Sequence, residues 1–343
     1  MAQPNNPPKE LKLLLSNPEV RFAIEAARQA ALIVRRVQQE LITPALTKED
    51  RSPVTVADFA AQAVIGRLLA QFYPSDALVA EEDSAALGEP NNAPTLELVT
   101  RFVGEGDRRV SPEQVCGWID HNRADSAERF WTLDPIDGTK GFLRGEQYAV
   151  ALALVVGGRV QVGVLGCPNL TAASRPEIGG AGALVVAACG QGAWTTSLSR
   201  VEPVPFERLN VSQVNQTSQA RILRSVESGH TNVDQIGEFA RLLGVEAPAV
   251  SMDSQAKYAV LAAGQGDLYL RLLSTEKPNY RERIWDQAAG AIIIEEAGGR
   301  VTDLDGQALD FTSGRMLKNN RGILASNSLL HPAALSALRR LGA

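Results

Sequence analysis

Two aspartates followed by a glycine run have the clearest chemical potential in this sequence. Residues 131–142 are WTLDPIDGTKGF, in which Asp134 and Asp137 flank a Pro-Ile pair. Proline fixes its own φ and restricts the residue before it, so both carboxylates belong to a stiff segment. Carboxylates held so close repel each other unless a cation binds there. The alternative is an ordinary Asp-Gly turn, because both residue types favour turns.

Further acidic residues stand at expected strand ends or helix starts. Glu81 ends the apolar stretch ALVAEED, and Asp286 precedes an alanine-rich helix. Asp58 lies near the start of another expected helix, where its spacing from Thr55 matches a capping box. Each residue therefore has a structural alternative, as a solvated strand end or a helix cap. Gathered from separate elements, they would instead supply the oxygen ligands that Mg²⁺ prefers.

The other residue types and motifs limit which metal and which reaction the acidic residues could serve. The chain has only three histidines and no HExxH motif, so a bound metal would need oxygen ligands and would be Mg²⁺, Mn²⁺ or Ca²⁺. A pair of such ions can activate water and stabilise a leaving oxygen. The backbone amides at Gly138 and Thr139 can cradle a phosphate at a helix start. The sequence has no GxxxxGK[ST] motif and no GxGxxG that follows a strand and opens a helix, which argues against an NTPase and a dinucleotide-binding protein. The pattern indicates metal-assisted phosphoester chemistry.

Composition excludes several other classes. The chain of 343 residues is 45% hydrophobic, enough for one large domain or two packed ones, and carries a net charge of −5. It has no basic stripe for a nucleic-acid polymer and no apolar run near the roughly 20 residues of a membrane span. The N-terminal residues lack a signal core. Three cysteines without a CxxC motif indicate buried thiols in a reducing compartment. We therefore expect a cytoplasmic protein.

Hydrophobic periodicity predicts an α+β part followed by an α/β part. We expect a first domain at 1–209 that holds the metal site, and a second at 210–343 that binds the substrate. Residues 84–128 are rich in glycine, proline and charge, which predicts an insertion or mobile loop. The expected helices are 20–41, 52–72, the segments VDQIGEFARLLG, SQAKYAVLAAG and DQAAGAIIIEEAGG, and 331–341; the expected strands include 77–83, a hairpin around Gly157-Gly158, and the segments GALVVAACG, GAWTTS, RILRSVE, DLYLRLL and GILASN.

The segment DPIDGTKGF resembles the signature of the lithium-sensitive, Mg²⁺-dependent phosphomonoesterases of the inositol monophosphatase superfamily. Four other stretches agree in order along nearly the whole chain: SPVTVADFAAQ (52–62), EE (81–82), SQAKY (254–258) and IWDQAAG (284–290). Three stretches resemble the 3′(2′),5′-bisphosphate nucleotidase branch: GTKGFLRGEQYAVALAL (138–154), GCPN (166–169) and MDSQAKYAVLAAGQGDLYLRL (252–272).

The resemblance implies a layered α/β/α/β/α fold and hydrolysis of the 3′-phosphate of 3′-phosphoadenosine 5′-phosphate to AMP and phosphate. The sulfated nucleotide, 3′-phosphoadenosine 5′-phosphosulfate, is implied as a second substrate, which connects the chain to sulfur metabolism. Water activated by two or three Mg²⁺ ions would attack phosphorus without a covalent intermediate. The implied partner is a small nucleotide, and we expect a monomer.

Residue roles carry over by motif. The implied metal ligands are Glu81, Asp134, Asp137, Asp286 and the carbonyl of Ile136. Asp58 and Thr139 would orient and activate the water. The implied substrate contacts are Gly138, Thr139, Asp286, His230, Ser254, Lys257 and Arg271, of which Lys257 and Arg271 would neutralise the 5′-phosphate. Structural alternatives are a helix cap for Ser254, a solvated strand position for Arg271 and a surface loop for His230.

Two rival functions remain open. An inositol polyphosphate 1-phosphatase or a broad sugar phosphatase would keep the same acidic site, and only residues 220–275 discriminate between the substrates. Their pattern favours the nucleotide. A non-catalytic nucleotide sensor would have lost a ligand or water-activating residue, whereas all those implied by the resemblance are present.

Overall fold

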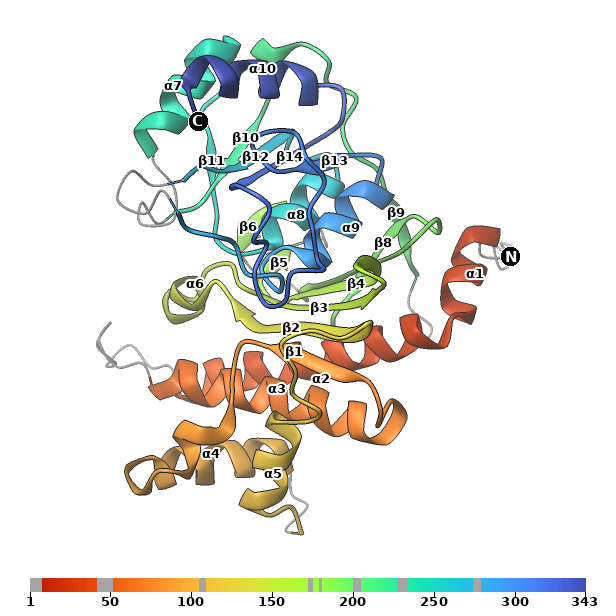
Figure 1. Ribbon diagram of the computed structural model, residues 1–343, viewed down its shortest axis with the longest axis vertical. Helices are drawn as coiled ribbons and strands as arrows, with labels where there is room; N and C mark the ends of the chain where they lie inside the picture. Colours follow the sequence, from red (N-terminus) through yellow and green to blue (C-terminus); the bar gives the residue numbers. More distant parts are fainter. Residues whose placement is uncertain are drawn as a thin grey trace.

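The computed structural model describes residues 8–41, 52–104, 109–171, 175–178, 181–199, 205–226, 233–273 and 279–343. Within these ranges the elements stack as alternating layers of helix and sheet, from the two long helices of the lower half to the last helix at the top (Figure 1). The layered α/β/α/β/α architecture implied by the sequence is confirmed.

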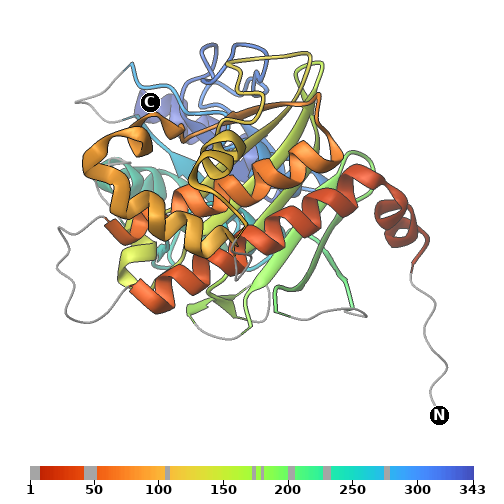
Figure 2. The same cartoon turned by 90° about the horizontal axis from the view of Figure 1, so that it is seen from below.

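Two long helices form the first layer. Helix α2 (Pro18–Leu41) follows the short α1 (Lys9–Ser16), and α3 (Ser52–Phe72) lies beside α2 (Figures 1 and 2). The apolar side chains of α2 recur every three or four residues and are buried, as expected of a helix that covers one face of a sheet. Both helices match the ranges predicted from periodicity.

A seven-stranded sheet forms the second layer, in the order β1-β2-β3-β4-β7-β8-β9. Strand β1 is parallel to β2, and every other neighbouring pair is antiparallel. The predicted hairpin is confirmed, since Gly157 and Gly158 between β3 and β4 both have positive φ, as a tight two-residue turn requires. The strands are β1 (Ala77–Ala80), β2 (Arg129–Asp137), β3 (Ala149–Val156), β4 (Arg159–Cys167), β7 (Ala183–Ala188), β8 (Ala193–Ser197) and β9 (Glu207–Leu209), beside a separate pair, β5 (Leu170–Thr171) and β6 (Arg175–Ile178).

Helices α8 (Ala256–Ala262) and α9 (Ala288–Glu296) lie between this sheet and a second one. Residues 288–294 of α9 are all buried, which is what a helix with a sheet on both sides requires. The second sheet has the order β11-β10-β12-β14-β13, and α7 (Val233–Leu243) and α10 (His331–Leu341) cover its outer face (Figure 1). Its strands are β10 (Ile222–Arg224), β11 (Val250–Ser251), β12 (Leu268–Arg271), β13 (Arg300–Thr302) and β14 (Ile323–Ser326). The chain thus passes from the first sheet to the second between β9 and β10. The division into two domains at 209/210 stays a prediction.

The prediction of a loop over 84–128 is wrong for most of that segment. It contains α4 (Ala93–Gly104), α5 (Pro112–Ile119) and two short 3₁₀ turns, η1 (Ser84–Gly88) and η2 (Pro90–Asn92). Val99, Phe102 and Val103 are buried, and α4 and α5 pack against α3. The glycine and proline residues lie near the ends of these short helices, and their high content predicts a loop although apolar residues recur between them.

Three smaller expectations are tested by the structure. The capping box of Thr55 and Asp58 is wrong, because α3 begins at Ser52 and both residues lie inside its first two turns. All three cysteines are free thiols, but only Cys167 is buried, and Cys189 is exposed, so the prediction of buried thiols is wrong for it. No helix in the described ranges is both long and apolar enough to cross a membrane. The cytoplasmic location stays a prediction.

Candidate active site

A cavity of about 540 Å³ brings together residues from both sheets and from the helices between them. Its lining contains acidic side chains, called the acidic wall below, basic side chains, called the basic wall, and aromatic rings. The acidic residues are Glu81, Asp134, Asp137, Asp253 and Asp286, the basic ones are Lys140, Lys257, Arg271 and Arg283, and the aromatic ones are Tyr269, Tyr280 and Trp285.

A bulge in β2 explains the spacing of its two aspartates. In a regular strand, residues three apart point to opposite faces. Asp134 pairs with Ala151 and Asp137 with Ala149, so β2 has one residue more than its partner between these pairs. The extra residue turns both carboxylates into the same cavity. Proline is tolerated here, because a bulge leaves a backbone position without a ladder hydrogen bond.

The other acidic side chains arrive from separate elements. Glu81 follows the last residue of β1, which is parallel to β2, so Glu81 emerges at the same sheet edge as Asp134. Asp286 stands before α9, whose N-cap is Gln287, and therefore reaches the cavity from the helix layer. This convergence of strand ends and a helix start agrees with the predicted acidic constellation.

The acidic group is electrostatically strained without a cation. Burial raises the pKa of Asp134 well above its ordinary value, and the charges of Glu81 and Asp137 raise it further. Burial also raises the pKa of Asp286, with Asp137 adding to the effect. The pKa of Glu81 is raised by burial and by Asp137, while a hydrogen bond with Asp134 opposes the rise. Carboxyl groups this close either share protons or bind positive charge.

Asp58 lies behind this group, outside the cavity wall. Its side chain on α3 is buried, and burial raises its pKa well above the ordinary value, with Glu82 and then Glu81 adding like charge. Burial, with the charges of Glu81 and Asp83, raises the pKa of Glu82 to about 7. The acidic cluster therefore continues from the cavity into α3.

The basic side chains are held by internal partners. Lys257 of α8 is almost fully buried, and its Nζ donates to the carbonyl oxygen of Met252 at 3.1 Å. Arg271 at the end of β12 donates from Nε to Oε1 of Glu282 at 2.9 Å, so its predicted alternative as a solvated strand residue is wrong. Burial lowers the pKa of Lys257 to about 8, against the stabilising charge of Asp137.

The glycine run permits close packing of the two halves of the site. Gly138 has φ +90°, and a Cβ there would lie 2.9 Å from the Cβ of Ser254. A Cβ at Gly141 would lie 2.1 Å from the carbonyl oxygen of Gln147. Gly138 is the N-cap of α6 (Thr139–Arg144) and has no side chain to cap it. Gly138 thus brings the β2 turn against Ser254, and the start of α6, which has no side-chain cap, lies in the cavity wall.

The structure gathers most of the residues predicted from sequence. Those in the cavity wall are Glu81, Asp134, Ile136, Asp137, Gly138, Thr139, Ser254, Lys257, Arg271 and Asp286. Asp58 is adjacent to them but buried, and His230 lies outside the described residues. Sequence reasoning missed Arg283 and Trp285 although they lie in or beside the quoted IWDQAAG stretch; Tyr280 and Ser225 carried no signal in the sequence.

The donor set fits Mg²⁺. It consists of carboxylate oxygens and a buried main-chain turn, the ligand type that this ion prefers, and the like charges raise one another's pKa. Within the described ranges, no group of three or more His, Cys, Asp or Glu side chains is arranged so that it could hold a metal ion without further ligands. Mg²⁺ characteristically takes one or two carboxylates and completes its shell with water and substrate phosphate, so an open arrangement agrees with it.

A layered α/β/α/β/α fold with acidic side chains at the strand ends is the architecture of the inositol monophosphatase structures that this chain resembles. The family model of the inositol monophosphatase family matches residues 16–343, and the chain belongs to this family, as the sequence indicated.

Curated relatives agree over nearly the full length. A protein of Oryza sativa named 3′(2′),5′-bisphosphate nucleotidase is 41% identical over 340 residues, covering 94% of this chain and 93% of the relative. A protein of Schizosaccharomyces pombe with the same name is 41% identical over 328 residues, covering 90% and 91%. Among solved structures, an IMPase of Thermotoga maritima has a TM-score of 0.62 at 21% identity, covering 95% of this chain and 98% of that one. The latter likeness shows the fold.

Proposed function

We propose that this protein hydrolyses the 3′-phosphate of 3′-phosphoadenosine 5′-phosphate, giving AMP and phosphate. The observation that carries the proposal is a single cavity lined both by the carboxylates of the acidic wall and by Lys257 and Arg271. A substrate with two phosphates needs two such sites, one for the reacting group and one for the other anion. The names of the curated relatives support the same substrate.

The acidic wall would hold the reacting phosphate through Mg²⁺, two or three ions being expected. The proposed ligands are the carboxylates of Glu81, Asp134, Asp137 and Asp286 and the carbonyl of Ile136. When bound, the ions supply positive charge for the phosphate and lower the pKa of a water molecule. Lithium sensitivity is part of this proposal.

The chain's own groups then orient the reactants. Thr139 Oγ1 lies 3.5 Å from the carbonyl oxygen of Ile136, beside the uncapped amides at the start of α6. These donors would bind phosphate oxygens and fix the line of attack. Asp58, buried behind Glu81, would orient and activate the attacking water together with Thr139, because bound Mg²⁺ would lower the pKa of that water.

The second phosphate would bind at Lys257 and Arg271, with Ser254 beside them. Glu282 keeps Arg271 in place, and its other oxygen accepts from Nε2 of Gln287 at 3.0 Å. This support lets the guanidinium face the cavity in a fixed orientation. The sulfated nucleotide fits the same two sites, because its 5′-group is also anionic. His230 remains a proposed nucleotide contact.

The deciding experiment is phosphate release, with Mg²⁺, from 3′-phosphoadenosine 5′-phosphate, inositol 1-phosphate and inositol 1,4-bisphosphate in parallel. We expect strong preference for the nucleotide. A preference for an inositol phosphate would keep the acidic site and refute the assignment of the basic wall. If none of the three is hydrolysed while the nucleotide binds, the protein is a sensor and the catalytic assignment is wrong.

A further inference from the structure

Arg283 is a cation of the cavity wall with no role in the assignment above. Its side chain is exposed, and its guanidinium carbon lies 5.7 Å from the centre of the Trp285 ring. Arg315 approaches the same ring at 4.7 Å. An arginine stacked on an indole keeps the donors at the edge of its guanidinium plane available for a ligand.

Within the described residues, Arg283 differs from the two cavity cations assigned to the substrate's second phosphate. Lys257 donates to a carbonyl oxygen and Arg271 forms an ion pair with Glu282. The guanidinium of Arg283 makes neither a hydrogen bond nor an ion pair with any described residue, and the Trp285 ring is its contact. A positive charge held over an aromatic face in the wall of this cavity has its hydrogen-bonding capacity free for an incoming anion.

The backbone around Arg283 is fixed by a short two-stranded ladder. Arg283 forms an isolated antiparallel bridge with Met316, and Leu317 N donates to the carbonyl oxygen of Glu282 at 2.9 Å. Arg315 in turn donates from Nη2 to the carbonyl oxygen of Ala80 at 2.8 Å. Since Ala80 precedes Glu81, this ladder holds the Arg283 segment beside the acidic end of the cavity.

Charge effects agree with that placement. Burial raises the pKa of Glu81, and Arg283 acts against the rise. Burial raises the pKa of Asp137 as well, and there Lys257 and Arg271 oppose it. Arg283 therefore lies close enough to Glu81 for its charge to favour the ionised carboxylate.

We propose that Arg283 binds the phosphate group undergoing hydrolysis, and not the second phosphate of the substrate. The inference rests on the proposed phosphomonoesterase function. The planar guanidinium would donate two parallel N–H bonds to non-bridging phosphate oxygens, a geometry that arginine and phosphate favour. No proton is transferred by Arg283. The same contact would hold the inorganic phosphate product.

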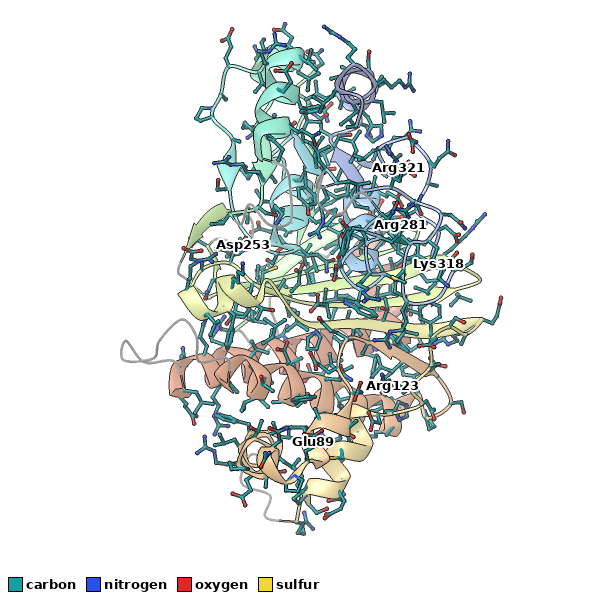
Figure 3. All side chains as sticks on the ribbon, turned by 60° about the vertical axis from the view of Figure 1, so that its left-hand side comes forward. Glu89, Arg123, Asp253, Arg281, Lys318 and Arg321 are labelled. Carbon is teal, nitrogen blue, oxygen red and sulfur yellow. The ribbon has the colours of Figure 1, made fainter. Side chains whose placement is uncertain are left out.

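The test compares Arg283→Met with a neighbouring arginine. Arg281 is the matched control, because it lies outside the cavity wall. Its Nε donates to the carbonyl oxygen of Lys318 at 3.3 Å, and Figure 3 shows the two residues near each other. The substrates are 3′-phosphoadenosine 5′-phosphate and adenosine 3′-phosphate, which lacks the second phosphate. Arg283→Met is expected to lower kcat/KM about tenfold or more on both, by an equal factor. Arg283→Lys should recover part of the loss, and Arg281→Met should leave both values unchanged.

A second measurement does not need turnover. Calorimetric binding of inorganic phosphate to the Mg²⁺-loaded protein should weaken about tenfold or more in Arg283→Met and stay normal in Arg281→Met. A loss of kcat/KM confined to the bisphosphate, or unchanged phosphate affinity, would overturn the inference. Failure of the wild-type protein to hydrolyse either nucleotide would refute the proposed function instead. The phosphate affinities of the wild type and of Arg283→Met would still test whether Arg283 binds phosphate.

Discussion

The carboxylate of Asp137 accepts a hydrogen bond of 2.6 Å from the backbone amide of Gln255. Asp137 ends a strand of the first sheet, and Gln255 is the N-cap of α8, which carries Lys257. Ser254, with φ +66°, turns the chain so that this amide points at the carboxylate. The acidic and basic walls of the cavity are thus joined by one short, charge-assisted bond.

Asp137→Asn should abolish turnover and leave the fold intact. The amide oxygen can still accept from Gln255, but the side chain loses the negative charge proposed to bind Mg²⁺. We expect kcat to fall by about 10²–10³-fold or more, the cost of losing one preorganised electrostatic group. Phosphate release and circular dichroism measure the two effects. Asp305→Asn, at an exposed position paired with Arg321, is the control. Near-normal Mg²⁺-dependent activity of Asp137→Asn would refute the metal assignment.

Lys257→Met should separate the two phosphates of the substrate. The change keeps an unbranched side chain one atom shorter and removes the charge proposed to bind the second phosphate. We expect KM for 3′-phosphoadenosine 5′-phosphate to rise about 10–100-fold, with little change for adenosine 3′-phosphate. Because the carbonyl of Met252 loses its donor, a fall in melting temperature is also expected. Equal effects on both substrates would remove Lys257 from the second phosphate site.

The pKa of Lys257 predicts how substrate preference changes with pH. Burial lowers the pKa of Lys257 to about 8, so the side chain is charged below that pH and neutral above it. Mg²⁺ beside Asp137 would lower the pKa further, because it offsets the carboxylate charge that favours the ammonium. The ratio of kcat/KM for the bisphosphate to that for adenosine 3′-phosphate should therefore fall from pH 7 to pH 9. In Lys257→Arg, which stays charged, a pH-independent ratio is expected. A flat wild-type ratio would contradict the prediction.

The sequence was sufficient for the long elements and the acidic wall. Helices α2 and α3 and the β3–β4 hairpin have strong periodicity or unambiguous turn residues. Asp134 and Asp137 could be identified because proline and glycine restrict the backbone around them. What the sequence did not show is the bulge that turns both carboxylates to one face, since register depends on pairing with β3.

The wrong or incomplete predictions for α4, Arg271 and Gly138 concern features that depend on contacts between separate segments of the folded chain. Helix α4 is short, and its apolar stripe is meaningful only against α3. The partner of Arg271, Glu282, is eleven residues away along the chain, and nothing in the sequence spacing shows that the two side chains pair. Gly138 was expected to admit a phosphate, but its missing Cβ also makes room for Ser254, 116 residues later. Single-sequence reasoning has no access to such distant pairs.

Metal binding should change the pH dependence of stability. A carboxyl group whose pKa is raised in the folded state stabilises the fold below its unfolded pKa, and this contribution is lost as pH rises through the folded value. Burial raises the pKa of Glu82 from 4.5 to about 7, which places its loss between about pH 4.5 and 7. The raised pKa of Asp134 acts in the same direction. With chelator present, the free energy of unfolding should therefore fall over this range.

Mg²⁺ should reverse that loss at neutral pH. At a concentration a hundredfold above its Kd, it should add about 2.7 kcal/mol to the free energy of unfolding. Urea denaturation at pH 5.5 and 7.5, with and without Mg²⁺, measures both effects. Asp134→Asn is the informative variant, because it should stabilise the metal-free protein at pH 7.5 and reduce the gain from Mg²⁺. A metal-free protein more stable at pH 7.5 than at 5.5 would contradict the electrostatic argument.

Gly138 and Gly145 offer a matched pair for the role of close packing at the site. Both are left-handed, with φ +90° and +71°, so alanine at either should cost about 1–2 kcal/mol in backbone strain. At Gly145 a Cβ meets nothing within 4 Å, whereas at Gly138 it would lie 2.9 Å from Cβ of Ser254. Gly145→Ala should therefore be destabilised with unchanged kcat/KM.

Gly138→Ala should be destabilised more and should also lose activity. The added methyl group must push Ser254 away, which lengthens the bond between Asp137 and the Gln255 amide and separates the two walls of the cavity. We expect kcat/KM for the bisphosphate to fall more than that for adenosine 3′-phosphate, because Lys257 moves with α8. Urea denaturation and phosphate release on the two variants test this. Equal losses of stability and activity in both would show that backbone strain alone accounts for the effect, and that the contact with Ser254 does not position the site.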